Sequence, residues 1–553
     1  MIQYYHRGCD SMKPLLIAIN AKYIHTNNAV RLLKANSRFK IDYIEFTTKD
    51  TLDDIVNTIL DYQPTLIGFS TYIWNIEIIK KLVITLKKHL SIPIILGGPE
   101  VSYDAETFIN ELPIDLIAKG ESEHIFDDII DHFHNQKPLT NTPNITTKNL
   151  NHPIEEIDDL SRLKSPHFEV SDIEHIPNRI NYLESSRGCP YNCSYCLSSL
   201  EKKVRFFPLK TVQENLLYLI KHNAKTIKFL DRTFNANRQM LDLIDTIILH
   251  HKPGQSYQFE ITADRIDEAI INHIHSHAPK QLFRFEIGIQ STHPLTNKLV
   301  DRTQDNTRLF NTIKTIIKHD IIDLHLDLIA GLPKEDLPRF KETFNTVFKL
   351  GAKELQLGFL KMLRGTKIRA QADYFNYQFN PTAPYEIISN DCLSKDDLQR
   401  IHHVEATLNL FHNKGHFGFL VFEHAKEKNP FDFFESIYQF TNQKNFNLHR
   451  YQLDELYQLY EAFLLKEGFT QQALDEVRKH YLMRSNIKPK VYFPILTDKT
   501  IKHSWFEVLH KEHALPLNDL FKYSICVILN QKPHIFYYQN NTVKLYTIRK
   551  PQA

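Results

Sequence analysis

The chain is poor in the residues that mark cross-linked, basic or membrane-spanning proteins. Its 553 residues include only six cysteines, and its formal net charge is +2. So few cysteines do not make a disulfide framework, and so small a charge does not indicate nucleic-acid binding. No apolar run approaches the ~20 residues of a membrane-spanning helix, and the run at residues 15–19 is too short for a signal peptide. We therefore expect a water-soluble chain of about two to four domains.

Half of the cysteines stand in one short stretch. Cys189, Cys193 and Cys196 follow the spacing Cys-x3-Cys-x2-Cys. Thiolates this close together suit a soft metal centre, but a closed structural zinc site takes four ligands and no fourth follows nearby. A [4Fe–4S] cluster on three thiolates leaves one iron free to bind another molecule. The spacing therefore predicts an open iron–sulfur centre. The alternatives are a zinc knuckle with a distant ligand and chance clustering in a loop. Thiolate ligands also favour a reducing compartment, the cytoplasm.

Short apolar runs alternate with amphipathic stretches in the first part of the chain. The runs that we expect to form strands are residues 15–19, 41–46, 66–70, 92–96 and 116–118. Helical patterns lie between them, and this alternation predicts βαβ units around a parallel sheet. We expect a flavodoxin-like domain over residues 12–135, with its ligand crevice at the carboxyl ends of the strands. Residues 1–11 show no periodicity and are expected to form a disordered tail.

Small residues stand at two of these strand ends. Ser70 ends the third run, and the pair Gly97 and Gly98 follows the fourth. Glycine at a strand end lets the backbone approach a bulky ligand closely. By itself the pair also fits a tight turn that binds nothing.

Prolines break the pattern over residues 136–181, which we interpret as a linker. The alternation resumes over residues 182–370, with further strands expected at 226–230, 257–262, 283–289, 324–329 and 355–359. With the strand that leads into the cysteine stretch, these predict a partial (β/α)6 TIM-type barrel, whose reactive groups lie at the strand carboxyl ends. Polar residues at or near these ends are Asp231, Glu260, Gln290, Arg302 and Asp327.

Residues 371–553 do not extend the barrel. Helical periods near 396–411, 451–467 and 471–481 predict a mainly helical C-terminal domain. Two apolar runs at 534–538 and 543–547 flank an asparagine-rich turn and predict a closing β-hairpin. Phe431, Phe433 and Phe434 fit a helical core better than the wall of a substrate site.

The cysteine spacing, with Tyr195 just before Cys196, resembles the radical S-adenosylmethionine (radical SAM) superfamily. The resemblance implies an enzyme with a [4Fe–4S] cluster on Cys189, Cys193 and Cys196, whose free iron is chelated by S-adenosylmethionine (SAM). An external one-electron donor such as flavodoxin or ferredoxin would reduce the cluster. Reductive cleavage of SAM would then give methionine and a 5′-deoxyadenosyl radical.

The same resemblance assigns the SAM contacts. Glu260 and Asp327 would hold the ribose. Gln290 and Arg302 would hold the polar ends, with Arg302 paired to the carboxylate. The remaining implied contacts are Tyr195 and Gly288, near the adenine or the methionine backbone, and Asp231, near the amino group.

An α/β domain ahead of this motif, with a helical domain behind it, resembles a bacterial family of cobalamin-binding radical SAM proteins. Residues 67–70 and 96–100 match the pocket that holds the nucleotide tail of cobalamin in that family, which makes Ser70, Gly97 and Gly98 the implied cobalamin contacts. The Asp-x-His-x-x-Gly motif that supplies a histidine ligand to cobalt is absent. His25 lies near the corresponding strand end, but we expect it to be a polar turn residue.

The implied reaction is cobalamin-dependent methyl transfer to an unactivated carbon of an unknown substrate. One alternative is a non-methylating radical SAM oxidoreductase. A methylthiotransferase is disfavoured because no cysteine-bearing first domain and no RNA-binding module are visible. The rival from another class is a cobalamin-sensing or redox-sensing binding protein. A further alternative is a first domain that binds no cobalamin because Tyr72, Trp74 and Tyr103 fill its crevice.

Overall fold

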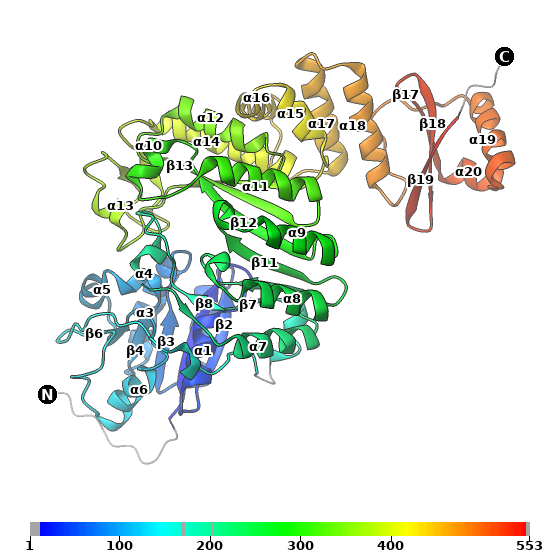
Figure 1. Cartoon of the computed structure of the whole chain (residues 1–553). Coiled ribbons are helices and arrows are strands. Elements are labelled where there is room, and N and C mark those ends of the chain that lie inside the picture. The colour runs from blue at the N-terminus through cyan, green and yellow to red at the C-terminus, as the bar shows by residue number, and fades with distance from the viewer. Residues whose placement is uncertain (1–11, 169–171, 202, 549–553) are drawn as a thin grey trace. The chain divides into compact units, whose positions relative to one another are not determined.

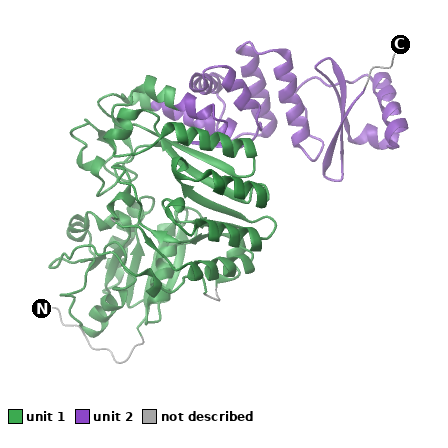
Figure 2. Cartoon of the chain, in the orientation of Figure 1, with its two compact units in different colours: residues 1–343, 357–398 green, residues 344–356, 399–553 purple. Residues whose placement is uncertain are grey.

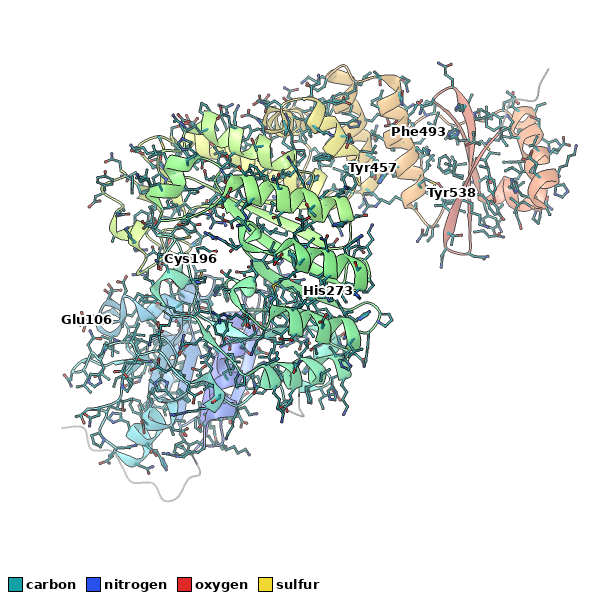
Figure 3. The ribbon with its side chains drawn as sticks, viewed as in Figure 1. Glu106, Cys196, His273, Tyr457, Phe493 and Tyr538 are labelled. Atoms are coloured by element: carbon teal, nitrogen blue, oxygen red, sulfur yellow. The ribbon has the colours of Figure 1, made fainter. Side chains whose placement is uncertain are left out.

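The computed structural model describes residues 12–168, 172–201 and 203–548 (Figure 1), so the tail expected at residues 1–11 lies outside these ranges. The chain divides into two compact units, one of residues 1–343 and 357–398 and one of residues 344–356 and 399–553 (Figure 2). Figure 3 labels Glu106 and Cys196 in the first unit and Tyr457 and Tyr538 in the second. No helix in the described ranges has the length and apolar character needed to cross a membrane.

The first domain is built on a six-stranded sheet with the order β2-β1-β3-β4-β5-β6. The first five strands are parallel, as predicted: β1 (Pro14–Asn20), β2 (Asp42–Thr47), β3 (Leu66–Ser70), β4 (Ile94–Gly97) and β5 (Leu116–Ala118). The sixth, β6 (Ile145–Thr146), comes from the expected linker and pairs antiparallel with β5. The helices are α1 (Asn28–Asn36), α2 (Leu52–Tyr62), α3 (Ile76–His89), α4 (Pro99–Ser102), α5 (Ala105–Glu111) and α6 (Phe126–Asn135). The order of the parallel strands is flavodoxin-like.

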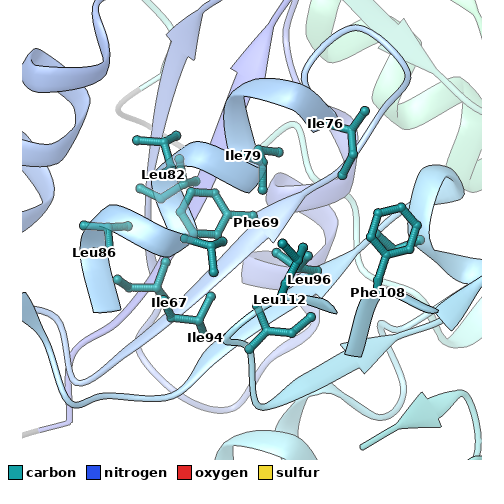
Figure 4. Close-up of a cluster of buried hydrophobic side chains, with 14 of the residues drawn as sticks. Ile67, Phe69, Ile76, Ile79, Leu82, Leu86, Ile94, Leu96, Phe108 and Leu112 are labelled. Atoms are coloured by element: carbon teal, nitrogen blue, oxygen red, sulfur yellow. The ribbon is translucent and has the colours of Figure 1, made fainter. Parts of the chain in front are cut away.

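Both faces of this sheet are buried. In β1, Leu15 and Ile17 belong to an apolar cluster formed with α2, α3 and α5, which Figure 4 shows around Ile67 and Phe69. Leu16, which points the other way, belongs to a second cluster formed with α1 and α6. Alternate residues of a strand point to opposite faces, so a sheet covered on both sides requires continuous apolar runs. This requirement is why the strands were visible in the sequence.

The second sheet forms a partial barrel with the strand order β14-β13-β12-β11-β10-β7. Its strands are β7 (Ile180–Leu183), β10 (Thr226–Phe229), β11 (Ser256–Ile261), β12 (Phe283–Gln290), β13 (Asp323–Ala330) and β14 (Glu354–Phe359). The helices that alternate with them are α7 (Leu209–Lys221), α8 (Met240–His250), α9 (Glu268–His277), α10 (Pro294–Leu299), α11 (Asn306–His319) and α12 (Leu337–Phe348). The predicted fold class, an α/β domain followed by a six-stranded partial barrel and a helical region, is confirmed.

Short elements complete the first unit. The strands β8 (Ser186–Arg187) and β9 (Arg205–Phe206) form a small hairpin around the cysteine stretch. After the barrel come α13 (Lys367–Ala370), β15 (Gln378–Phe379) and β16 (Ile387–Ser389).

The second unit is mainly helical and ends in a small sheet. Its helices, with α14 shared between the units, are α14 (Lys395–Leu408), α15 (Leu420–Glu427), α16 (Pro430–Gln443), α17 (Leu453–Lys466), α18 (Gln471–Arg484), α19 (Lys499–His513) and α20 (Leu517–Tyr523). The predicted hairpin is present as β18 (Lys532–Gln539) and β19 (Thr542–Thr547), and β17 (Ser524–Leu529) adds a strand that was not predicted.

The phenylalanines of α16 are core residues. Phe431, Phe433 and Phe434 are at most 4% exposed. The rings of Phe433 and Phe463 lie 5.4 Å apart between centroids, and those of Phe431 and Phe344 lie 5.7 Å apart. Their packing inside the second unit agrees with the predicted core role.

Candidate functional site

The cysteine stretch is held by a short hairpin. β8, which follows β7, pairs antiparallel with β9, and Gly188 leaves β8 with φ +88°. A Cβ atom at Gly188 would lie 2.1 Å from the carbonyl oxygen of Lys203, so this position requires glycine. Further along, the backbone N–H of Ser194 donates to the carbonyl of Val300 at 2.9 Å, and the N–H of Ile368 donates to the carbonyl of Ser194 at 2.9 Å. Ser194, between the second and third cysteines, is therefore held by backbone hydrogen bonds to two other segments of the first unit.

The three clustered cysteines are free thiols. Burial raises the pKa of Cys189, and the neighbouring thiols of Cys196 and Cys193 raise it further, which places the three sulfurs in one neighbourhood. The Cys189 sulfur lies 3.6 Å from the Thr233 hydroxyl. Within the described ranges no group of three His, Cys, Asp or Glu residues is already in position to hold a metal ion. The donor chemistry and the loop position fit an iron–sulfur cluster, but the thiols would have to converge on it.

The barrel strands carry a polar inner face. In β12 the residues alternate strictly, with Phe285 and Ile287 buried and Glu286 half-buried on the opposite face. The Lys228 ammonium of β10 lies 2.6 Å from the Glu286 carboxylate. In β13 the Nε2 atom of the His325 ring lies 2.9 Å from the Asp327 carboxylate. The contact is a hydrogen bond if the ring is neutral and an ion pair if the ring is protonated. The face of the barrel sheet opposite its apolar core therefore carries charged side chains from several strands, such as Lys228 of β10, Glu286 of β12 and Asp327 of β13.

Glu260 and Asp327 lie on this polar face, where the sequence placed them. Glu260 is opposite Glu286, and Asp327 is opposite Gly288 on β12. Burial raises the pKa of Glu260, and the nearby Arg232 guanidinium counteracts that shift. Both carboxylates can accept hydrogen bonds from a polar ligand in the barrel.

Four predicted SAM contacts meet at the end of β12. The Arg302 guanidinium donates to the Gly288 carbonyl and to the Tyr195 hydroxyl, the latter at 3.3 Å, and lies 3.8 Å from the Cys193 sulfur. Gln290 has φ +66°, and its side-chain oxygen is buried without a hydrogen-bond partner among the residues that the structure describes. A Cβ atom at Gly288 would lie 2.4 Å from the Gln290 amide nitrogen, so glycine leaves room for that amide. A strained glutamine with a buried unpaired oxygen close to Arg302 fits the predicted contact with a ligand.

Asp231 is hydrogen-bonded within the protein. Its carboxylate accepts hydrogen bonds from the Ser185 N–H at 2.9 Å, from the Ser185 hydroxyl, and from the Ser186 hydroxyl at 2.6 Å. The side chain is 1% exposed, and burial raises its pKa to about 6. Asp231 therefore fixes the backbone just ahead of the cysteines, and its contact with the SAM amino group stays a prediction.

A cavity of about 1300 Å³ connects the strand ends of the first domain with the cysteine loop. Ser70, Gly97 and Gly98 line it from the first domain, while Arg187 and Gly188 line it from the hairpin ahead of the cysteines. The Ser70 hydroxyl accepts from the Asn27 amide at 3.1 Å, and Gly98 has φ +112° with no room for a Cβ atom beside the Thr71 carbonyl. Ser70, Gly97 and Gly98, which we call the cradle, thus line the same cavity as residues on both sides of the cysteine stretch, such as Gly188 and Leu197.

The aromatic residues line this cavity and do not fill it. Tyr72 and Trp74 stack with ring centroids 4.4 Å apart, and the Trp74 indole donates to the Ile19 carbonyl at 3.0 Å. Tyr103 also lies on the wall. The alternative in which these three rings close the crevice is therefore wrong. His25 lines the cavity too, and its Nδ1 lies 2.7 Å from the Tyr182 hydroxyl, which gives it a protein partner.

Sequence reasoning missed one group of charges at the cavity wall. Arg187 and Arg205, on β8 and β9, pair with Glu121 after β5, and Arg187 also pairs with Glu123. Arg187 stands two residues before Cys189, but Glu121 and Glu123 lie more than sixty positions away from it. No local pattern could have revealed these pairs.

Three families match successive parts of the chain. The B12 binding domain matches residues 14–130, and the radical SAM superfamily matches residues 183–347. The family described as "Protein of unknown function (DUF4080)" matches residues 373–528.

The chain is also similar to individual proteins. The chain is 22% identical over 335 residues to an uncharacterized methyltransferase of Pyrococcus horikoshii, a match that covers 58% of this chain and 71% of that protein. It is 21% identical over 312 residues to the cobalamin-dependent radical SAM methyltransferase TokK of Streptomyces tokunonensis, covering 53% of this chain and 46% of TokK. The structure of the radical SAM methyltransferase TsrM of Kitasatospora setae, with cobalamin and [4Fe–4S] cluster bound, matches with a TM-score of 0.58 at 15% identity, over 68% of this chain and 82% of that chain.

These findings define the protein as a radical SAM protein with an N-terminal B12-binding domain. The cofactors that the two domains imply are a [4Fe–4S] cluster, SAM and cobalamin, which confirms the predicted set.

Proposed function

We propose that this protein is a cobalamin-dependent radical SAM methyltransferase. It would bind a [4Fe–4S] cluster through Cys189, Cys193 and Cys196, cleave SAM reductively, and methylate an unactivated carbon of a substrate that is still to be identified. An external one-electron donor such as flavodoxin or ferredoxin would supply the electron. One observation carries the proposal: the small-residue cradle of the first domain and the cysteine loop of the barrel line the same cavity. The similarity to methyltransferases of this class supports it.

The bound cofactors would supply the electron transfer, the cleavable sulfonium and the methyl carrier, and the protein would bind and orient them. Arg302, in the loop after α10, lies close to both Tyr195 and Cys193 of the cysteine loop. We assign it to the SAM carboxylate. Gln290 and Gly288 form the adjoining wall, and the carboxylates of Glu260 and Asp327 would accept from the ribose hydroxyls.

On the first domain, Ser70, Gly97 and Gly98 would border the nucleotide tail of cobalamin. Leu16, Gly68 and Ala118 line the base of the same cavity, so it extends along the apolar face of the sheet. An apolar channel with small residues at its entrance suits a long, bulky group that must pass between strand ends. We propose that no histidine of the chain ligates cobalt, because the Asp-x-His-x-x-Gly motif that would supply one is absent. His25, which lines this cavity, is hydrogen-bonded to Tyr182 through Nδ1.

We also propose the boundaries that this assignment implies. A cobalamin-binding domain would span residues 12–135, a linker residues 136–181, the radical SAM barrel residues 182–370 and the C-terminal domain residues 371–553.

The test is anaerobic reconstitution of the full chain with iron, sulfide and hydroxocobalamin, followed by reduction in the presence of SAM. We expect about four irons per chain, retained corrinoid, and release of methionine with 5′-deoxyadenosine or S-adenosylhomocysteine. A protein that retains the corrinoid and the irons but cleaves no SAM would favour a sensing role. A protein that cleaves SAM but retains no corrinoid would favour the non-methylating oxidoreductase.

A further inference from the structure

Two arginines face each other across the hairpin that precedes the cysteines. Arg187 on β8 and Arg205 on β9 are directly opposite in the antiparallel register. Like charges at opposite positions of paired strands destabilise the pair. Both side chains are also withdrawn from solvent, with 9% and 6% exposure. This arrangement needs an anion between the two guanidinium groups.

The anion comes from the first domain. Glu121 lies 3.3 Å from Arg187 through one carboxylate oxygen and 2.7 Å from Arg205 through the other. Its carboxylate also accepts from the backbone N–H of Ile157 at 2.7 Å, and Arg205 donates to the Ile157 carbonyl at 2.8 Å. A single side chain at the end of β5 therefore ties together the first domain, the segment after β6 and the cysteine hairpin.

A second carboxylate of the same loop completes the contact. Glu123 is 8% exposed and lies 2.7 Å from Arg187, which also contacts Glu184 at 3.1 Å. These charges raise the pKa of Arg187 well above its usual value, against the lowering effect of its burial. Glu121, Glu123, Glu184 and Arg187 all line the large cavity, as do Gly188 and the cradle residues. The ion pairs therefore belong to the cavity that the cradle and the cysteine hairpin share.

We propose that Arg187 is a positioning residue that sets the cysteine loop, and hence the cluster, at a fixed distance from the cobalamin cradle. Glu121 and Glu123 are its anchors on the first domain. Arg187 stands two positions before Cys189, with only Gly188 between them, so a displacement of its guanidinium moves the first cluster ligand directly. This inference rests on the proposed function, since it concerns the separation of the two cofactors.

The planar guanidinium is essential to this role. It contacts three carboxylates at once, with its two terminal nitrogens divided among Glu121, Glu123 and Glu184. A lysine keeps the charge but has a single nitrogen and no fork geometry. The substitution Arg187→Lys therefore separates the positioning effect from the charge, while Glu123→Gln removes one anchor and leaves the other two carboxylates in place.

The separation of the cofactors can be measured directly by electron paramagnetic resonance. Full-length protein is reconstituted with iron, sulfide and hydroxocobalamin and reduced until cob(II)alamin and the cluster are both paramagnetic. The cluster then shortens the spin relaxation time of cob(II)alamin to an extent that falls steeply with distance. We expect this relaxation enhancement in the wild type and its loss in Arg187→Lys and Glu123→Gln at unchanged iron and corrinoid content.

The control is a buried ion pair of matched type in the second unit. Glu461 is 14% exposed and accepts from the Arg478 Nε at 3.0 Å. Glu461→Gln removes a buried carboxylate charge in the same way and should leave the relaxation enhancement intact. If Glu123→Gln does not load both cofactors, Glu123→Asp replaces it, because that change keeps the charge but shortens the contact.

The outcomes separate the two proposals. A wild-type protein that retains no corrinoid overturns the proposed function and this inference together. A wild type that loads both cofactors without relaxation enhancement overturns the inference alone, and so do loaded variants that relax like the wild type.

Discussion

The two parallel sheets of the first unit build their candidate sites in opposite ways. In the first domain both faces of the strands are apolar, and the ligand crevice is made by what is missing at the strand ends: Gly97 and Gly98 carry no side chain, and Ser70 a small one. In the barrel one face of each strand is polar, and the site is made by what is present, such as Glu260 and Asp327. The difference shows that one sheet provides space and the other provides charge. Substitutions that add bulk should therefore damage the first, and substitutions that remove charge should damage the second.

The largest effect is expected at the cysteine loop, on which both sheets depend. Replacing Cys189, Cys193 and Cys196 together by alanine removes every local thiolate ligand, so the variant should lose the cluster and all reductive SAM cleavage. Iron analysis after anaerobic reconstitution and product analysis by mass spectrometry measure both. Retained corrinoid in this variant would show that the cradle binds cobalamin without an intact cysteine loop. A full complement of iron would refute the assignment of the ligands.

For the barrel, we expect the substitution Arg302→Ala to weaken SAM binding, because it removes the positive charge that we assign to the SAM carboxylate. Removing a buried cation that pairs with another charge costs ~2–5 kcal/mol. The lower value corresponds to a roughly thirtyfold weaker affinity for SAM. Equilibrium binding of SAM to the reconstituted protein measures it, with iron content as the control for the loop. An unchanged SAM affinity in the variant at full iron content would show that Arg302 does not contact SAM.

On the first-domain side, Gly97→Val places a side chain where the cradle is empty. A Cβ atom there would lie 3.3 Å from the Ala118 carbonyl oxygen, and the valine methyl groups would extend into the space we assign to the cobalamin tail. We expect corrinoid affinity to fall about tenfold or more, which corresponds to ~1.4 kcal/mol, while SAM cleavage continues. If Gly97→Val retains as much corrinoid as the wild type, the cobalamin tail does not lie beside β4.

The last prediction concerns stability and not cofactor binding. The carboxylate of Asp231 belongs to neither site, because it accepts hydrogen bonds from Ser185 and Ser186. Its folded-state pKa of about 6 lies above the ordinary 3.8, so the folded state favours the protonated form. The stabilisation is present below pH ~4 and is lost as the pH rises through ~6, by at most ~3 kcal/mol for a shift of about two units.

Asp231→Asn removes this titration. The difference in the free energy of unfolding between wild type and variant should therefore change between pH 4 and pH 7, in the direction that penalises the wild type at the higher pH. Urea denaturation of the cofactor-free protein at the two pH values measures it. A constant difference would mean that the carboxylate stays ionised throughout.

Much of this architecture follows from local patterns. The continuous apolar runs of the first domain and the strict alternation in the barrel each reflect which faces are buried, so both sheets were predictable, and the cysteine spacing indicated the loop. The role of Asp231 was not predictable, because its partners Ser185 and Ser186 are about 45 residues away. The same holds for the pairing of Arg187 with Glu121, which depends on how the first domain meets the hairpin.

Elements without a strong period were missed as well. β6 is two residues long, and β17 precedes the predicted hairpin without an alternating pattern. Such segments become strands because a neighbouring strand offers an edge, which is a tertiary cause.

The central claim is that one cavity joins a cobalamin cradle to a cluster loop, and titration of the anaerobic, reconstituted protein with hydroxocobalamin tests it most directly. After desalting, we expect stoichiometric corrinoid on the wild type, with a visible spectrum that does not change in His25→Ala, and clearly less corrinoid on Gly97→Val. A wild-type protein that retains no corrinoid would contradict the account.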